Sequence, residues 1–501
     1  MMAPSHIIAS KRDNVAIAIA ELVPGDEVAG GALVTEPIRT GHKVALNPIA
    51  AGAPVIKLGQ PIGIATRPIA AGEHVHTHNL ASEGQADRTE IGVDIKVPAP
   101  APAQFEGYVR ADGRIGTRNF IGILTSVNCS ATVARRIAAH FTPEMLRRYP
   151  GVDGVVSFTH MSGCGMAKEG RGIDNLRRTI SGYASHPNFA AVLIVGLGCE
   201  VNQIDPLLAS AKLEKLDRLQ TLTIQGAGGT MAAIEEGIAI VDAMLPAANV
   251  CQRQTVSAEH LTIGLQCGAS DGYSALTANP ALGAAVDRLV AAGGRAILSE
   301  TPEIYGAENL LLRRASSIGV ADALIERLNW WEEYVTRDGA SLDYKPSPGN
   351  KAGGITTILE KSLGAVAKSG TTPLNAVVDY AETVTATGLT FMDSPGYDPC
   401  SATGQIAGGA HLILFTTGRG SVFGSIPAPT VKLASNAALA HSISDDIDID
   451  CSGVLAGVTG AHMGSRIFDL IIATASGRTT ASERLAIGEN EWVPWVPGPM
   501  L

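Results

Sequence analysis

The spacing of apolar positions changes near residue 105, and this change separates regions of different predicted structure. In residues 1–80, short apolar runs are separated by turn signals such as Pro24-Gly25-Asp26 and Ala71-Gly72. Short runs bounded by turn residues are typical of β-structure, so we expect a small β-rich domain there. Residues 81–104 have low hydrophobicity and alternate Pro with Ala, which favours an extended, semi-rigid linker.

Beyond the linker, apolar runs end in Gly-rich loops that lead into segments with helical spacing. The runs are FIGILTSV, VDGVVSF, AAVLIVGLG, TLTIQGAG, LTIGLQ and RAILSE. The spacing predicts helices over residues 131–141, 229–244 and 279–292. Alternating strands and helices indicate an α/β fold with parallel sheets. A break in this pattern at residues 251–260 predicts a first α/β domain over 105–250 and a second over 251–501.

Composition narrows the range of partners. The chain has 501 residues, and 48 acidic against 38 basic side chains give a formal net charge of −10, which disfavours a nucleic-acid partner. The N-terminal segment does not resemble a secretion signal, and no apolar stretch reaches the length of a membrane span. The seven cysteines are widely spaced and odd in number, unlike a disulfide framework. We therefore expect a cytoplasmic protein with reduced thiols, no membrane and a small-molecule partner.

Oligomeric state has two open interpretations. The Trp pairs at 330–331 and in EWVPWVPGPM suit either a homo-oligomer interface or internal packing.

Five cysteines lie in loops where ligands commonly bind. Cys129, Cys164, Cys199 and Cys267 each follow a predicted strand closely, and Cys400 lies in the loop SPGYDPCSATG. Because the carboxyl ends of parallel strands form a ligand-binding rim, we expect these thiols to converge on one crevice. A metal or positive charge there would favour thiolates. The alternative is that they are small buried hydrophobic residues.

Three histidines at the end of the β-rich region alternate along the chain. His74, His76 and His78 would share one face of a strand. Neighbouring imidazoles can chelate a divalent first-row metal, and a free imidazole could act as a general base near neutral pH. The alternative is an exposed polar strand face.

Basic residues in Gly-rich loops are candidates for binding anions. They are His42, Lys43, Arg118, Lys351 and Arg419. Backbone N–H groups, a hydroxyl and one cation form a compact cradle for a carboxylate or phosphate, although each such loop could also be a solvated turn. No complete dinucleotide or ATP phosphate motif is present, so we do not expect these cofactors.

Long motifs spread over the chain carry a family resemblance. The segments EGYVRADGRIGTRNFIGILTSVNCSATVARRIA, FTHMSGCGM, GLGCEVNQ, LQCGASDGYSALTANPALG, SPGNKAGG, KSGTTPLN and FTTGRGS resemble the altronate and galactarate dehydratase family. The N-terminal segments GHKVAL, IGIA and GEHVHTHN resemble the SAF-type domain of that family. The resemblance implies a hydro-lyase that converts a sugar acid, with altronate favoured, to a 2-keto-3-deoxy acid.

The resemblance also implies iron(II), or manganese(II), as cofactor. We predict a catalytic set, a substrate-binding set and a metal set, whose roles are interchangeable at this stage. They are, in that order, His42, Lys43, Cys129, Cys164, Cys199 and Cys267; Arg118, Lys351 and Arg419; and His74, His76 and His78. Closure of the small domain onto the α/β body would bring these sets together.

Several alternatives stay open. The loop cysteines could instead hold a [4Fe–4S] cluster with an open iron. The substrate could be galactarate or another aldonate, or sulfolactate with C–S cleavage. A sugar-acid binding or sensing protein on the same fold is the non-enzymatic alternative.

Overall fold

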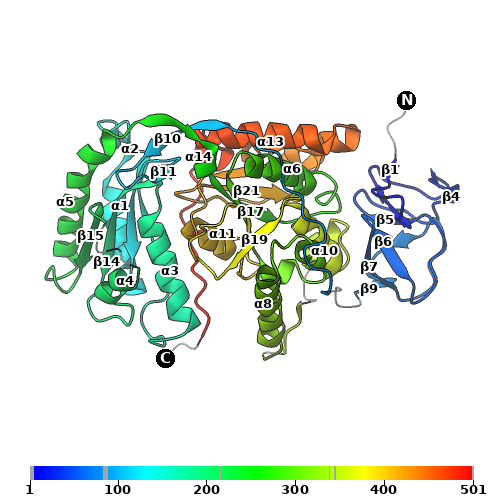
Figure 1. The fold of residues 1–501 in the computed structure, drawn as a ribbon, viewed down its shortest axis with the longest axis horizontal. Helices are drawn as coiled ribbons and strands as arrows, with labels where there is room; N and C mark the ends of the chain where they lie inside the picture. The colour runs from blue at the N-terminus through cyan, green and yellow to red at the C-terminus, as the bar shows by residue number, and fades with distance from the viewer. Residues whose placement is uncertain are drawn as a thin grey trace.

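Three sheet-centred regions follow one another along the long axis of the molecule. The computed structural model describes residues 5–82, 88–211, 213, 216–337, 339–342 and 346–498. In Figure 1 the N-terminal domain lies at one end, and the sheet with β14 and β15 lies at the other. The largest sheet, with β17 and β21, lies between them.

The N-terminal domain is built from short antiparallel strands, as its sequence pattern predicts. Two sheets have the orders β1-β2-β5-β8 and β6-β7-β9, and β3 pairs with β4. The strands are β1 (His6–Ile7), β2 (Val15–Ala18), β3 (Glu27–Val28), β4 (Ala32–Leu33), β5 (Lys43–Ala45), β6 (Pro54–Lys57), β7 (Gln60–Ala65), β8 (His74–Val75) and β9 (Leu80–Ala81). Strand β2 is entirely buried, so it forms the centre of this domain.

The next region is a four-stranded parallel sheet of order β13-β12-β14-β15. Helices α1 and α5 pack on one face and α3 and α4 on the other, which explains why FAAVLIVG in β14 is continuously apolar. The elements are β12 (Phe120–Thr125), α1 (Ala131–His140), α2 (Pro143–Leu146), β13 (Gly154–Phe158), α3 (Arg171–Ser185), β14 (Phe189–Gly196), α4 (Ile204–Ala211), β15 (Leu219–Thr223) and α5 (Thr230–Asn249).

The third region is a seven-stranded sheet of order β19-β20-β18-β17-β21-β22-β23, parallel throughout. Its strands are β17 (Thr262–Gly268), β18 (Arg295–Leu298), β19 (Leu374–Val378), β20 (Gly388–Met392), β21 (Leu412–Thr417), β22 (Thr430–Ala434) and β23 (Ile449–Asp450). Its helices are α6 (Ala278–Ala291), α7 (Asn309–Leu312), α8 (Ile318–Arg337), α9 (Pro348–Ala352), α10 (Ile358–Ala367), α11 (Asp398–Ala407), α12 (Ala437–Ser442), α13 (Gly460–Ala475) and α14 (Ala481–Arg484). These two parallel sheets confirm the predicted fold class.

The two α/β regions share a hydrophobic core. Residues of α3 and α11 belong to one buried cluster, which also contains Trp492 from the C-terminal segment. At Gly182 in α3, a Cβ atom would lie 2.3 Å from the backbone oxygen of Ala407, so the two helices touch backbone to backbone. This packing fixes the two regions against each other.

An antiparallel ribbon joins these two regions. Strand β10 (Gln104–Val109) pairs with β11 (Ile115–Gly116) on one side and with β16 (Arg253–Ser257) on the other. The predicted break at residues 251–260 therefore contains a strand. Strand β16 lies at the edge of a narrow sheet, so its residues are largely polar and partly exposed. The sequence pattern therefore did not predict a strand there.

The described part of the linker lies on the third region. The backbone nitrogens of Gly92, Asp94 and Ala101 donate to Leu312, Arg313 and Ala291 at 3.0, 2.7 and 2.8 Å. These bonds keep the extended segment in place, as a semi-rigid connection requires.

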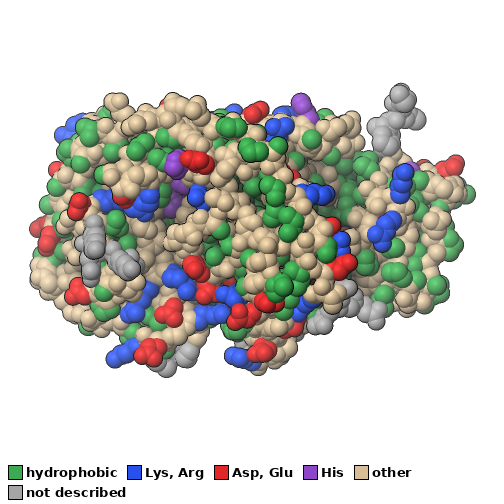
Figure 2. Space-filling view, in the orientation of Figure 1, with side chains coloured by type: hydrophobic (Ala, Val, Ile, Leu, Met, Phe, Trp, Pro, Cys, Tyr) green, Lys and Arg blue, Asp and Glu red, His purple; other side chains and the backbone are tan. Residues whose placement is uncertain are grey.

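The predicted helices differ from the observed ones mainly at their ends. Helix α5 continues to Asn249, beyond the predicted end at residue 244. Pro246 lies in its last turn and does not end the helix. No helix in the described part of the chain is both long and apolar enough to cross a membrane. On the face drawn in Figure 2, acidic and basic side chains are intermixed rather than gathered in a stripe of one sign.

Candidate functional site at the junction of the N-terminal domain and the large sheet

The N-terminal domain contacts the loops at the carboxyl ends of the large parallel sheet. The phenolic oxygen of Tyr273, just after β17, donates to the backbone oxygen of Ala18 at 2.8 Å. A Cβ atom at Gly272 or Gly354 would lie 2.0 or 2.2 Å from the backbone oxygen of Gly41, so both positions need glycine. This edge of a parallel sheet is where ligands commonly bind, and here a second domain covers it.

A buried ion cluster crosses this junction. The carboxylate of Glu360 in α10 accepts from Lys43 at 2.9 Å and from Lys57 at 2.7 Å, and all three side chains are buried. The Lys43 ammonium also donates to the backbone oxygen of Gly354 and the hydroxyl of Thr356, at 2.7 and 2.8 Å. Lys43, which the sequence placed in the catalytic set, is therefore enclosed by protein groups and anchors the junction.

The charges of this cluster depend on one another. Burial lowers the pKa of Lys43 to about 8, although Glu360 opposes the shift. Burial alone would raise the pKa of Glu360, but Lys43 and Lys57 outweigh it and hold that pKa well below its ordinary value. The negative charge of Glu360 therefore compensates the positive charge of the two buried ammonium groups.

Four imidazoles gather beside this cluster. The Nδ1 atom of His42 lies 3.0 Å from Nε2 of His74, and Nδ1 of His76 lies 2.9 Å from the hydroxyl of Thr356. Ring centroids are 4.9 Å apart for His42 and His76, 5.5 Å for His74 and His76, and 5.4 Å for His74 and His78. The predicted histidines therefore lie together, and His42 joins them.

The predicted strand geometry of these histidines is wrong in detail. Strand β8 ends at Val75, and the chain turns back at once, with the backbone nitrogens of Asn79 and Leu80 donating to the oxygen of His76. The histidines converge because of this turn, and not because they alternate along a strand.

Two of the imidazoles are neutral above about pH 4. Burial, with help from neighbouring positive groups, lowers the pKa of His74 to about 3 and that of His76 to about 4. Burial also lowers the pKa of His42. A neutral imidazole has a free lone pair, which is the form that binds a metal or accepts a proton.

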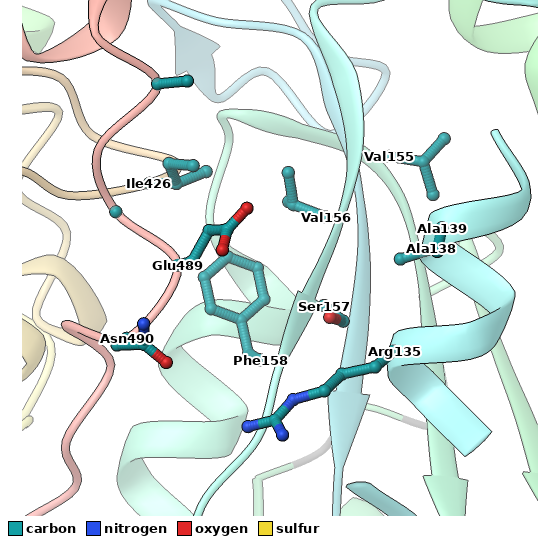
Figure 3. Close-up of a pocket in the computed structure, with 12 residues that line it drawn as sticks. Arg135, Ala138, Ala139, Val155, Val156, Ser157, Phe158, Ile426, Glu489 and Asn490 are labelled. Atoms are coloured by element: carbon teal, nitrogen blue, oxygen red, sulfur yellow. The ribbon is translucent and has the colours of Figure 1, made fainter. Parts of the chain in front are cut away.

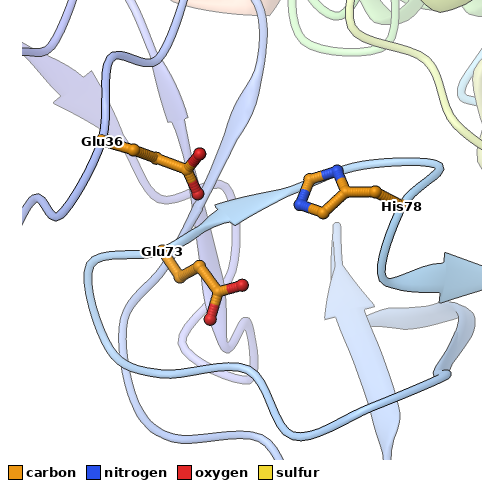
Figure 4. A group of neighbouring side chains, drawn as sticks. All are labelled: Glu36, Glu73 and His78. Carbon is orange, nitrogen blue, oxygen red and sulfur yellow. The ribbon is translucent and has the colours of Figure 1, made fainter.

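Carboxylates lie at the solvent side of the histidine group. Figure 4 shows Glu36 and Glu73 near His78, and one ligand atom from each of the three lies within 4.8 Å of the others. Glu73 is also held by an ion pair with Arg67. Imidazole nitrogens with carboxylate oxygens are a donor set that suits a divalent first-row ion.

Two predicted substrate-binding cations border the same junction. Arg419, in the loop after β21, is exposed, and its Cδ would lie 3.3 Å from a Cβ at Gly353. Lys351 in α9 is half-buried. Within the described ranges, neither side chain has a hydrogen-bond or ion-pair partner. Both cations are therefore available to an anionic ligand.

Asp271 fixes the loop between these cations and the sheet. Its Oδ1 accepts from the hydroxyls of Ser274 and Ser435 at 2.8 Å, and its Oδ2 accepts from the amide of Asn436 at 2.9 Å. Neither Asp271 nor Glu360 was among the predicted residues. A signal for Glu360 existed, because it stands with Lys361 in the otherwise apolar helix ILEKSLGAVA.

Arg118 is a correction to the predicted substrate-binding set. Its guanidinium is buried and pairs with Glu483, with 2.6 Å between Nε and Oε1. It also donates to the backbone oxygens of Thr474 and Arg478, at 2.9 and 3.1 Å. Arg118 precedes β12, at the amino edge of its sheet, and ties the two α/β regions together. These contacts leave it no role in substrate binding.

The five loop cysteines do not converge on one crevice, so that prediction is wrong. Cys129, Cys164 and Cys199 are exposed and follow strands of the four-stranded sheet, which lies at the opposite end of the molecule from the N-terminal domain in Figure 1. Cys267 and Cys400 are buried in the other sheet region. The chain places five similar loops on two different sheets, which spacing along the sequence does not distinguish.

Cys267 belongs to a buried charged cluster behind the junction. Its sulfur and one oxygen each of Glu300 and Glu303 lie within 4.8 Å of one another. Lys368 donates to the sulfur at 3.1 Å, and Lys361 pairs with Glu303 at 2.7 Å. Burial raises the pKa of Cys267, so the predicted thiolate at this position is disfavoured.

A separate cavity of about 580 Å³ lies far from these groups, between β13 and the C-terminal segment (Figure 3). Arg135 and Glu489 are its only charged lining residues among those described, and its lining contains neither histidine nor cysteine. This composition offers no acid, base or metal ligand comparable to the junction.

Comparison with known proteins agrees with this arrangement. Three family profiles match: the altronate/galactarate dehydratase SAF domain at residues 4–83, the D-galactarate dehydratase/altronate hydrolase second domain at 107–249, and the D-galactarate/altronate dehydratase C-terminal domain at 258–500.

Three relatives cover most of the chain. Altronate dehydratase of Escherichia coli (strain K12) is 37% identical over 478 residues, which are 94% of this chain and 95% of the relative. Galactarate dehydratase (L-threo-forming) of the same strain is 34% identical over 507 residues, 97% of this chain and 96% of the relative. The (2R)-sulfolactate sulfo-lyase subunit beta of Chromohalobacter salexigens is 30% identical over 400 residues, 78% of this chain and 96% of the relative. The chain therefore belongs to the altronate/galactarate dehydratase family, a family of hydro-lyases that act on sugar acids.

Proposed function

We propose that this enzyme removes water from D-altronate, giving a 2-keto-3-deoxy acid, and that the reaction takes place at the junction described above. The observation that carries the proposal is the meeting of four imidazoles with two cations, which have no partner among the described residues, at the carboxyl edge of the large sheet. Altronate presents one carboxylate and several hydroxyls, which these groups can bind. Free thiols and the acidic net charge fit a cytoplasmic enzyme.

The donor set fits a divalent ion such as iron(II) or manganese(II). We propose Glu36, Glu73 and His78 as ligands, because one ligand atom of each lies within 4.8 Å of the other two. A bound ion would act as a Lewis acid and stabilise enolate charge on the substrate.

His76 is the proposed general base. Thr356 holds its Nδ1, which leaves Nε2 free to take the proton from C2 of the substrate. The pKa of His76 lies at about 4 because of burial and nearby positive groups, so the ring is neutral before substrate binds. The negative charge of a bound sugar acid would raise this pKa towards neutrality, which makes the imidazole a stronger base.

Arg419 and Lys351 are the proposed anchors of the substrate carboxylate. An Arg can bind a carboxylate through two parallel hydrogen bonds, and this fixes the orientation of C2 and C3. The C2 proton passes to the base, the C3 hydroxyl leaves as water after protonation, and the resulting enol tautomerises to the keto acid. The reaction thus releases one water for each sugar acid.

The first test is anaerobic turnover with added iron(II) of altronate, galactarate, mannonate, gluconate and sulfolactate. Formation of 2-keto acid from altronate, at a much higher kcat/KM than from the other aldonates, is the expected result. Turnover of galactarate instead would move the assignment within the family. Sulfite release from sulfolactate would change the bond that is broken, which the similarity to the sulfo-lyase subunit makes the second candidate.

Two variants separate the proposed roles. His76→Ala should lower kcat by about 10²–10⁴-fold, the usual contribution of a general base, while the iron content stays unchanged. His78→Ala should lose iron. His260→Ala, at an exposed position, is the control and should affect neither. Loss of iron in His76→Ala with full activity restored by excess iron would contradict the assignment of His76 as base.

A further inference from the structure

Three exposed cysteines lie in neighbouring loops at the carboxyl edge of the four-stranded sheet. Cys129 follows β12, Cys164 follows β13 and Cys199 follows β14, and these three strands are parallel neighbours. Free cysteine is among the most buried residue types in proteins, so three exposed thiols from adjacent strands call for a chemical reason. The junction described above uses none of them.

The loop that carries Cys129 is hydrogen-bonded to the loop that carries Cys164. The backbone nitrogen of Asn128 donates to the oxygen of Ser162 at 2.9 Å, and its side-chain amide donates to the oxygen of His160 at 3.0 Å. A Cβ atom at Gly163 would lie 2.4 Å from the backbone oxygen of Ser126. The glycine before Cys164 therefore brings the two loops into direct contact.

The loop that carries Cys199 is tied to both of the others. The hydroxyl of Ser126 donates to Glu200 at 2.7 Å, and the side-chain amide of Asn202 donates to the backbone oxygen of Ser126 at 3.1 Å. The backbone nitrogen of Asn202 donates to the oxygen of Gly163 at 3.0 Å. Each cysteine is thus next to residues fixed by hydrogen bonds, so the three thiols have defined positions.

We propose that Cys129, Cys164 and Cys199 bind a [4Fe–4S] cluster. Cysteine thiolates are the usual ligands of such clusters, and soft sulfur donors select them. Among the described residues, these sulfurs do not form a set within 4.8 Å of one another, and a single ion would need a closer set than a cluster does.

Three protein thiolates leave the fourth iron of the cluster open to a small ligand. A cavity of about 740 Å³ borders Cys164 and is also lined by Arg171, Trp330 and Tyr334. The Arg171 guanidinium lies 4.0 Å from the centroid of the Trp330 ring and pairs with Asp393 at 3.1 Å. A fixed cation at an open cavity suits an anionic ligand, and small hydroxycarboxylates combine a carboxylate with an oxygen that binds iron.

This cluster site is independent of the proposed junction site. The two lie in different sheet regions (Figure 1), so a variant at one should leave the metal content of the other unchanged. His76→Ala should therefore retain the full cluster, and failure of the altronate assignment would not affect the cluster measurement.

The test is anaerobic reconstitution of the full chain with iron(III), dithiothreitol and sulfide, in which the thiol reduces part of the iron, followed by analysis of iron, acid-labile sulfide and the visible spectrum. The expected result is about four iron and four sulfide per chain in addition to any junction iron, with visible absorption that bleaches on reduction. Cys129→Ser, Cys164→Ser and Cys199→Ser should each lose the sulfide and the absorption. Cys251→Ser, a half-buried thiol after α5, is the matched control and should retain both.

Alkylation gives a second readout that does not depend on variants. In the metal-free protein, mass spectrometry should find Cys129, Cys164 and Cys199 modified by iodoacetamide, and reconstitution should protect these three. Iron without sulfide, or a sulfide-containing cluster retained by all three serine variants, would overturn the proposal. Melting curves and gel filtration of each variant establish that loss of the cluster is not loss of the fold.

Discussion

Replacing Glu360 by Gln should loosen the N-terminal domain from the rest of the protein. The substitution keeps the size of the side chain but removes the charge that Lys43 and Lys57 share, at 2.9 and 2.7 Å. Attraction between unit charges at such distances is about 6 kcal/mol per pair at an effective dielectric constant of about 20, and desolvation of the ions offsets most of it. Breaking a buried pair costs about 3–5 kcal/mol, because the partner charges stay buried and uncompensated.

The loss should be local, because the ion cluster joins two domains instead of lying inside one core. Hydrogen exchange followed by mass spectrometry measures it directly, on peptides that cover β5 and residues 350–360. A cost of 3–5 kcal/mol, at about 1.4 kcal/mol per tenfold change, lowers protection there by about 10²-fold to about 4 × 10³-fold. Peptides from β12 and β14 should exchange as in the unchanged protein.

The matched control is Glu333→Gln, which removes a carboxylate that is 72% exposed and 3.9 Å from Arg337. An exposed pair of this kind contributes at most about 1 kcal/mol, so the control should leave exchange unchanged. Equal protection in Glu360→Gln and Glu333→Gln would refute the view that this buried charge holds the junction together.

Three further predictions address other parts of the molecule. Arg118→Ala should lower the free energy of unfolding by about 3 kcal/mol and leave kcat/KM of the folded enzyme unchanged. Arg419→Ala should raise KM about tenfold without lowering the melting temperature. The opposite pattern would restore Arg118 to the substrate site. Gly354→Ala should abolish activity because its Cβ would lie 2.2 Å from a backbone oxygen of the N-terminal domain. Gly409→Ala, which also has positive φ but meets no atom within 4 Å, should stay active, and equal loss in both would point to backbone strain alone. Burial lowers the pKa of His411 from 6.5 to about 4, so its contribution to stability is present above about pH 6.5 and falls towards pH 4, by up to about 1.4 kcal/mol per pH unit. Urea unfolding at pH 7, 6 and 5 measures this fall, and His411→Gln should reduce it; an identical slope in the variant would exclude the contribution.

The fold could be predicted largely because each parallel strand carries its own signal. A run such as FAAVLIVG is apolar throughout because helices cover both faces of the sheet, so its pattern does not depend on distant residues. The strand at Arg253–Ser257 escaped prediction because it is stabilised by pairing with β10, which follows from contact and not from composition.

The candidate site could be predicted only in part. His74, His76 and His78 stand close together in the sequence. They therefore lie close together in space even though the predicted strand at these residues is largely a turn. Arg118 was placed wrongly because a Gly-rich loop with an Arg looks the same whether its guanidinium meets a substrate or a buried Glu483. Glu360 was missed because its partners, Lys43 and Lys57, lie some 300 residues earlier in the chain.

The pairing of β10 with β16 means that the four-stranded sheet region is an insertion with adjacent ends. The chain leaves the ribbon after Val109 and returns to it at Arg253, and Gln104 stands opposite Ser257 in the register. Excision of residues 112–250 would therefore leave two ends that a short turn could join, as in a β-hairpin. Removal of the inserted region would leave the order of strands in the large sheet unchanged, but it would expose the face of α11 that packs against α3.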